Sequence, residues 1–175
     1  MMNNDILRSL RYTFDIDDQL MVKIFKLSGK VVSRQEVCAW LKREEDPDFI
    51  KCTNKEILDY LDGFILYKRG PSDRNKPETD QALNNNIILK KIKIALNLKS
   101  DDLISILKLS RVNISQHELS AFFRNKHHKN FRNCNDQFLR QLLKGLQLTY
   151  RPNSKIRGPL KKISLPPQEK LIQKK

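Results

Sequence analysis

Glycine, cysteine and long apolar runs are scarce in this 175-residue chain. It has five glycines and three cysteines, and no stretch of eighteen consecutive apolar residues. The low glycine content excludes a collagen-like fibre, and the lack of an apolar run excludes a membrane-spanning helix. Three cysteines are too few to staple a small secreted fold, and the start M-M-N-N-D-I-L-R lacks the apolar segment of a secretory signal. We therefore expect a cytoplasmic protein with no integral membrane association.

Charge, by contrast, is abundant and unevenly spread. Lys and Arg number 34 against 20 Asp and Glu, a formal net charge of +14, and 39% of the residues are hydrophobic, too many for a wholly disordered chain. Residues 1–70 hold 12 basic and 12 acidic residues, residues 82–152 hold 13 and 4, and residues 153–175 hold 7 and 1. A positive excess confined to the second half and the tail indicates a surface that faces a polyanion.

The two halves of the chain are copies of one another. A shift of 82 positions aligns residues 3–69 with residues 85–151 without a gap, and 17 of the 67 aligned pairs are identical, far above the ~5–7% expected by chance. The identical pairs include Ser33/Ser115, Glu36/Glu118, Phe49/Phe131, Cys52/Cys134, Gly63/Gly145 and Arg69/Arg151. So long a period indicates a duplicated domain and not a solenoid.

Each copy is predicted to form four short helices, because apolar residues recur at helical spacing and no segment alternates with period two. The predicted caps of the first helix are Asn3 or Asn4 in one copy and Asn85 or Asn86 in the other. Capping boxes are predicted to start the third helix of each copy and the fourth helix of the first: Ser33 with Glu36, Ser115 with Glu118, and Thr53 with Glu56. Asn135 is predicted to cap the remaining helix.

Two of the cysteines directly precede these predicted caps. Cys52 and Cys134 occupy the position before the fourth helix of each copy, where a small apolar side chain commonly packs back on the helix. We interpret both as small buried apolar residues, and a thiol function is the alternative.

These patterns predict an all-α protein of two homologous four-helix domains in tandem. The predicted segments are a neutral first repeat (3–70), a polar linker (71–84), a basic second repeat (85–152) and a basic, flexible tail (153–175). The second and third helices of each repeat are similar in outline to a helix-turn-helix. They depart from it at Phe25 and Leu107, which are bulky where a small residue usually permits close helix crossing.

The gapless duplication, the start N-N-D-I-L-R-S-L-R-Y and the repeat ends L-D-G-F-I-L-Y-K-R-G and L-K-G-L-Q-L-T-Y-R-P resemble the YehS-like family of small bacterial proteins. That family is a tandem repeat of a domain of unknown function, and the likeness extends to about Pro152. It implies two all-helical repeats in a bacterial cytosol, and it supplies no catalytic residues.

Motifs of known enzyme classes are absent from the sequence. It contains no G-x-S-x-G, Walker loop, G-x-G-x-x-G or H-E-x-x-H. His127, His128 and Cys134 would give a zinc site only three ligands, without a C-x-x-C pair to anchor it. The acidic stretch at 44–48 reads as a solvated loop without an acid–base partner. We therefore expect no catalysis, no cofactor and no metal.

Several acidic residues of the first repeat are replaced by basic residues in the second: Asp17, Glu44 and Asp62 align with Lys99, Lys126 and Lys144. The second repeat and tail are therefore predicted to bind nucleic acid, RNA or DNA, mainly through phosphate groups. The candidate residues are Lys90, Lys91, Lys93, Arg111, Arg124, Lys126, Lys129, Arg132, Arg140, Lys144 and Arg151 in the repeat, with Lys155, Arg157, Lys161 and Lys162 in the tail.

Aromatic residues beside these cations add a second expectation. Phe131 and Tyr150 could stack on unpaired bases, although Phe131 equally matches Phe49 as a core residue. Trp40 and its counterpart Phe122 are predicted to lie in the core.

Three alternatives to nucleic-acid binding remain open, the weakest of which is docking of the basic tail on an anionic membrane. The cations could be solvated helix faces, or they could meet an acidic protein, which would make the chain a protein-interaction adaptor. If the second repeat binds nucleic acid, the neutral first repeat is expected to form a homodimer or to recruit a protein partner.

Overall fold

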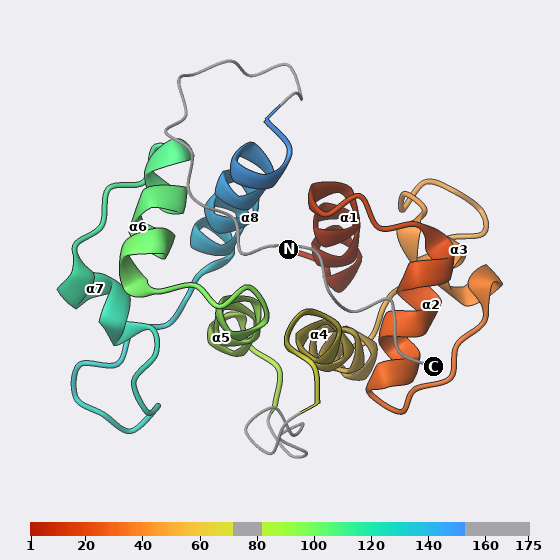
Figure 1. The fold of residues 1–175 in the computed structure, drawn as a ribbon, viewed down its shortest axis with the longest axis horizontal. Helices are drawn as coiled ribbons and strands as arrows, with labels where there is room; N and C mark the ends of the chain where they lie inside the picture. Colours follow the sequence, from red (N-terminus) through yellow and green to blue (C-terminus); the bar gives the residue numbers. More distant parts are fainter. Residues whose placement is uncertain (72–81, 153–175) are drawn as a thin grey trace.

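The computed structural model describes residues 1–71 and 82–152, which form eight helices and, within those ranges, no strand (Figure 1). The helices of the first repeat are α1 (Asn3–Thr13), α2 (Asp18–Leu27), α3 (Arg34–Leu41) and α4 (Asn54–Arg69). Those of the second are α5 (Asn85–Ala95), α6 (Ser100–Leu109), α7 (Gln116–Ala121) and α8 (Asp136–Tyr150). The predicted all-α tandem of four-helix units is confirmed. The predicted flexible tail and most of the linker lie outside the described residues.

Four helices form the middle of the molecule, two from each repeat. Helices α1 and α4 face α8 and α5, while α2 and α3 flank them on one side and α6 and α7 on the other (Figure 1). Helix α4 packs on α5, and α1 packs on α8. Exchange of the two repeats turns one of these contacts into the other, so an approximate twofold axis relates the repeats. A cluster of buried apolar side chains runs through both of them, which makes one shared core.

Aromatic rings fill part of the contact between the repeats. The ring of Phe14 lies 5.0 Å from that of Tyr150 and 5.3 Å from that of Phe64, measured between centroids. Burial raises the pKa of the half-buried Tyr150. The expectation that Tyr150 stacks on a nucleic-acid base is therefore wrong, because this ring packs against the first repeat. Trp40 and Phe122 lie in the core, as predicted.

The predicted helix starts are largely confirmed. Side-chain caps form at Ser33, Thr53, Ser115 and Asn135, with the box glutamates Glu36, Glu56 and Glu118. The exception is the first helix of each repeat, whose caps are Met2 and Asn84. Asn4 and Asn86 lie one position inside their helices and are buried, so the prediction of an asparagine cap is wrong at these two residues.

A glycine lies where the two longest helices cross their neighbours. A methyl group added to Gly63 on α4 would overlap the carbonyl oxygen of Ile24 on α2. A methyl group added to Gly145 on α8 would likewise meet the carbonyl of Ile106 on α6. The close crossing that requires a small residue is therefore that of the second and fourth helices of each repeat, and not that of the second and third helices.

Cys52 and Cys134 are buried, and burial raises the pKa of each thiol to about 12. Cys38 is half-buried on α3, with its Sγ 3.5 Å from Asp18 Oδ2. Because a thiolate is the reactive form of cysteine, we expect iodoacetamide at pH ~8 to modify Cys38 in the folded protein and to spare the other two. Mass spectrometry before and after denaturation checks this. Labelling of folded Cys52 as fast as Cys38 would contradict the buried apolar role.

Candidate nucleic-acid interface

The cations of the second repeat gather most densely between α7 and α8, in residues 122–135, which we name the basic loop. It contains the four cations Arg124, Lys126, Lys129 and Arg132, together with His127 and His128, and no Asp or Glu. The cluster follows α7, which ends at Ala121.

Backbone hydrogen bonds hold the basic loop in a defined shape. The N–H of Arg132 donates to the carbonyl of Ala121 at 3.1 Å, which closes the loop at its base. Within it, the N–H of His128 donates to the carbonyl of Asn125 at 2.9 Å, and the N–H of Phe131 donates to that of His128 at 2.8 Å. These bonds fix the backbone that carries the cations.

The first repeat contains the same loop with the opposite charge. In residues 40–53, which we name the acidic loop, Ile50 donates to Ala39, and Phe49 donates to Asp46, at the positions equivalent to those above. The N–H of Asp48 bonds Asp46 Oδ1 at 3.0 Å, where the N–H of Asn130 bonds His128 Nδ1 at 3.1 Å. The acidic loop has four carboxylates and three cations. One backbone framework therefore carries two different charge patterns.

One cation of the acidic loop, Lys42, is neutralised within it. Lys42 Nζ lies 3.0 Å from Asp46 and also contacts Asp48. The hydrogen bond to Asp48 is the main cause that raises the pKa of Lys42. The pKa of Asp46 is lowered, first by the N–H of Asp48 and then by Lys42. No carboxylate is available in the basic loop to do the same.

A buried asparagine ties each loop to the first helix of its repeat. Asn86 Nδ2 donates to the carbonyls of Phe122 and Arg132 at 2.9 and 2.8 Å, and its Oδ1 accepts the N–H of Cys134 at 2.9 Å. All hydrogen-bonding groups that a buried amide commonly needs are thereby engaged on loop backbone. The basic loop is thus clamped at both ends from α5.

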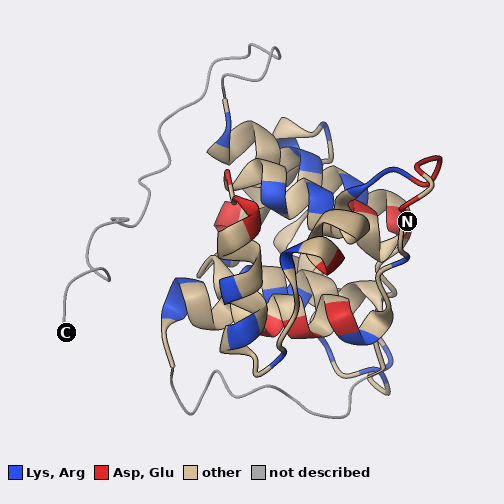
Figure 2. Cartoon of the chain, turned by 90° about the vertical axis from the view of Figure 1, so that its right-hand side faces the viewer, with Lys and Arg blue, Asp and Glu red and all other residues tan. Residues whose placement is uncertain are grey.

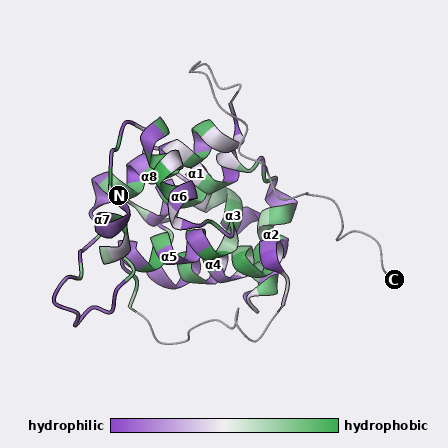
Figure 3. Ribbon diagram, turned by 60° about the vertical axis from the view of Figure 1, so that its left-hand side comes forward, coloured by the Kyte–Doolittle hydropathy of each residue, from purple (hydrophilic) through white to green (hydrophobic). Residues whose placement is uncertain are grey.

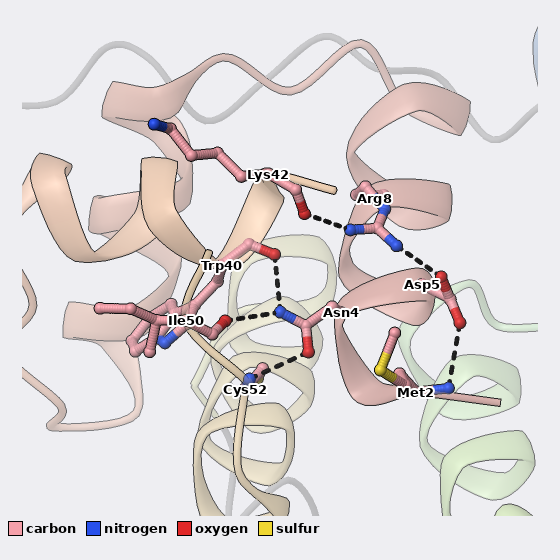
Figure 4. A network of polar contacts seen from close by, with 8 residues as sticks. All are labelled: Met2, Asn4, Asp5, Arg8, Trp40, Lys42, Ile50 and Cys52. Carbon is pink, nitrogen blue, oxygen red and sulfur yellow. Dashed lines mark hydrogen bonds and ion pairs between the residues drawn. The ribbon is translucent and has the colours of Figure 1, made fainter. Parts of the chain in front are cut away.

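Asn4 makes the equivalent bonds in the first repeat. Its Nδ2 donates to the carbonyls of Trp40 and Ile50, and its Oδ1 accepts the N–H of Cys52 (Figure 4). Sequence reasoning missed this role and assigned both asparagines to caps. The identity of Asn4 and Asn86 at the same register, one position inside each helix, was the signal that could have revealed it.

The basic loop exposes most of its charge. Lys126, Lys129 and Arg132 are exposed, and the guanidinium of Arg132 lies 5.4 Å from the centre of the Phe122 ring. The structure also brings Lys93 of α5 to the loop, with its Nζ 4.6 Å from the centre of the Phe123 ring. The loop projects from the molecule as a hydrophilic segment after α7 (Figure 3).

Two residues of the basic loop are less accessible to a nucleic acid, because both are half-buried. Arg124 is half-buried and donates to Ser120 Oγ at 3.3 Å and to the carbonyl of Asn130 at 3.2 Å. Phe131, whose sequence position allowed either base stacking or a core role, is half-buried.

Two carboxylates of the second repeat accept hydrogen bonds from backbone N–H groups at helix starts. Asp102 accepts the N–H of Lys99, and Glu118 accepts both the N–H and the Oγ–H of Ser115. The hydrogen bonds from Ser115 lower the pKa of Glu118. In the first repeat, by contrast, Asp5 pairs with Arg8, and Asp18 pairs with Arg11 at 2.9 Å. Seen from the side of α2 and α3, basic and acidic residues are interspersed (Figure 2).

Two predicted phosphate ligands lie at the contact between the repeats. Lys91 is buried and pairs with Asp62 on α4, so its assignment to a phosphate-binding surface is wrong. Arg151 donates to the carbonyl of Tyr12 at 2.7 Å and lies 3.2 Å from Asp15. Both residues join the second repeat to the first.

The remaining candidates are spread over other elements. Lys90 is exposed on α5, and Arg111 is exposed in the turn between α6 and α7, where its φ is +67°. Arg140 and Lys144 are exposed on α8, facing α1. The candidates of the tail, Lys155, Arg157, Lys161 and Lys162, lie outside the described residues. Among the candidates within residues 82–152, the structure therefore gathers a cluster only at the basic loop and Lys93.

Two further features bear on the kind of site. Over residues 1–71 and 82–152, no group of three His, Cys, Asp or Glu side chains lies close enough to hold a metal ion. Across the same part of the chain, no helix combines the length and the apolar character needed to cross a bilayer.

Comparison with known proteins places both repeats in one family. Residues 3–70 and 85–151 each match the family described as "Protein of unknown function (DUF1456)". The chain is 40% identical over 148 residues to "Uncharacterized protein YehS" of Escherichia coli strain K12, an alignment that covers 83% of this chain and 94% of that protein. No solved structure matches the chain. The chain thus belongs to the YehS-like family, whose members repeat a domain of unknown function in tandem.

Proposed function

We propose that this chain is a non-enzymatic cytoplasmic protein that binds nucleic acid, RNA or DNA, through phosphate contacts of the basic loop, Lys93 and the basic tail. The observation that supports this most directly is the pair of matched loops. Two loops with the same backbone hydrogen bonds differ in that one has four cations and no carboxylate, while the other neutralises its own lysine.

The chemistry of the loop fits phosphate better than base recognition. Lys126, Lys129 and Arg132 are exposed on a hydrogen-bonded backbone, and long cationic side chains bind phosphate oxygens without reading sequence. Each phosphate contact releases condensed counterions from the nucleic acid. With roughly four or five such contacts, affinity is expected to fall about 10²- to 10³-fold between ~50 and 200 mM salt.

The proposal is tested by neutralising exposed cations in either loop. Lys126→Gln with Lys129→Gln removes two charges from the basic loop. Fluorescence anisotropy with labelled duplex DNA and single-stranded RNA is expected to show about 10- to 50-fold weaker binding at ~0.1 M salt, with a salt slope lower by about 2.

The acidic loop offers the matched control. Arg43→Gln with Lys51→Gln removes the same number of exposed charges from the equivalent segment. This variant is expected to bind nucleic acid about as well as the parent chain. An affinity of the parent chain that does not respond to salt would refute the proposal, and so would an equal loss of affinity in both variants.

A second candidate function, a protein-interaction adaptor, is favoured by exposed apolar residues of the first repeat. Val31 is 83% exposed, and Leu27 and Ile50 are about half exposed. The positions equivalent to Val31 and Ile50 carry Asn113 and Arg132 in the second repeat. The adaptor would use this surface to hold a protein partner or a second copy of the chain. Absorbance of co-purified material that nuclease removes would favour nucleic acid, and its absence would favour the adaptor.

A further inference from the structure

A groove runs along the contact between α1 and α8. The approximate twofold axis relates this contact to the one between α4 and α5. Its volume is about 370 Å³, which lies in the range of small-molecule sites. Residues of both repeats line it: Met1, Asp5, Ser9, Arg140, Leu143, Lys144, Gln147 and Leu148. A ligand in this groove would contact both copies of the domain at once.

The equivalent contact between α4 and α5 shows what the groove lacks. There, Lys91 and Asp62 form an ion pair in which both side chains are largely buried. At the α1–α8 contact the matching positions hold Ser9 and Lys144. The lysine of one contact is thus replaced by a serine, and the aspartate by a lysine. Lys144 therefore has a serine, and not a carboxylate, at the position that matches the partner of Asp62.

Two neighbouring pairs of matched positions also differ, with an apolar residue at one contact and a charged residue at the other. Ile87 and Leu58 belong to the α4–α5 side, and their counterparts at the α1–α8 contact are Asp5 and Arg140. Apolar side chains that can close one contact are replaced by charged ones that keep the other accessible to solvent. The two equivalent contacts therefore differ in their charged residues, and the α1–α8 contact carries Arg140 and Lys144 beside the groove.

The α-amino group of the chain lowers the pKa of Asp136 and Arg140 helps to lower it, but the carboxylates beside the groove are bonded mainly to other groups. Arg140 and Lys144 are exposed and lie one turn apart on the same face of α8, where like charges repel each other. Asp5 is already bonded to Arg8 and to the N–H of Met2. Asp136 contacts the α-amino group of the chain and Asn85. An anion from outside the chain would relieve the repulsion.

We propose that this groove binds a small organic anion, whose phosphate or carboxylate group contacts Arg140 and Lys144 and whose apolar part packs on Leu143 and Leu148. The arginine fork can engage two oxygens of such a group, and the lysine adds a second charge. The proposal reassigns Arg140 and Lys144 from nucleic acid to a separate ligand, and it does not depend on nucleic-acid binding.

Isothermal titration of the full chain with three probes tests the ligand class. Hexyl phosphate and hexanoate each combine an anionic group with a short apolar chain, and inorganic phosphate has the anion alone. We expect at least one of the two chain-bearing probes to bind with a Kd of about 1 mM or tighter, and inorganic phosphate to bind at least about tenfold more weakly. The tighter of the two identifies phosphate or carboxylate as the preferred group. Absence of binding by both overturns the proposal.

Variants then locate the site. Arg140→Gln with Lys144→Gln is expected to weaken probe binding at least tenfold. Ser9→Lys with Lys144→Asp places at the α1–α8 contact the ion pair that closes the α4–α5 contact, and it is expected to abolish binding. Circular dichroism and the unfolding temperature show that each variant remains folded.

A control pair lies far from the groove. Lys23→Gln with Lys26→Gln removes two exposed charges from α2, and probe binding is expected to stay unchanged. Equal weakening in this control, or undiminished binding by the folded groove variants, overturns the proposal. Since none of these titrations contains nucleic acid, a failure of the loop variants to alter nucleic-acid affinity leaves this test intact.

Discussion

Replacing Gly63 with alanine is expected to lower the free energy of unfolding by at least about 3 kcal/mol, a large part of the stability of a chain this size. In an isolated helix the same substitution would stabilise by roughly 0.5–1 kcal/mol. The sign is reversed here because the added methyl group would overlap the backbone carbonyl of Ile24. A backbone group cannot swing aside, so α2 and α4 must separate. Their separation loosens the buried packing of Phe25 on Tyr60, whose ring centres lie 5.4 Å apart.

Urea unfolding of three variants checks this account. Gly145→Ala repeats the experiment in the second repeat, where the methyl group would meet Ile106, and a comparable loss is expected. Gly29→Ala is the control, because its φ is +87° and no atom lies within 4 Å of the added methyl group. The free energy of unfolding of this control is expected to fall by only about 1 kcal/mol. The matched residue Arg111 already carries a side chain at φ +67°. A loss of under ~1 kcal/mol in Gly63→Ala would contradict the close crossing.

Features fixed by neighbouring residues were predictable from the sequence. The capping boxes at Ser33 and Ser115 depend only on a glutamate three residues later, and both form as expected. The duplication likewise predicted two four-helix units, because a repeat of about 70 residues carries its own helical pattern. The two buried cysteines followed from the same local reasoning.

Features that depend on the partner repeat were not predictable in this way. Lys91 looked like any other lysine of α5, yet it is buried against Asp62 of the other copy. Tyr150 was expected to stack on a nucleic-acid base, yet its ring packs on Phe14 of the other copy. Periodicity within one copy gives the buried face of a helix but does not show which side meets the other copy.

The second large effect is expected from Asn86→Ala. Removing this buried amide leaves the carbonyls of Phe122 and Arg132 and the N–H of Cys134 without their partner. Unsatisfied buried polar groups destabilise the folded state, and we expect the free energy of unfolding to fall by about 3 kcal/mol. Because the same bonds hold both ends of the basic loop, affinity for nucleic acid is also expected to fall, by about fivefold or more, since the loop cations must then be ordered on binding.

Asn4→Ala separates the two effects, because Asn4 makes the same three bonds to the acidic loop. Urea unfolding is expected to show a similar loss of stability for both variants, about 3 kcal/mol. Anisotropy, measured where both remain folded, is expected to show weaker nucleic-acid binding for Asn86→Ala alone. Hydrogen exchange at the amide of Cys134 should accelerate in Asn86→Ala and not in Asn4→Ala. Equal affinities in the two variants would mean that the order of the basic loop does not contribute to binding, and the cations would then act as separate, mobile charges.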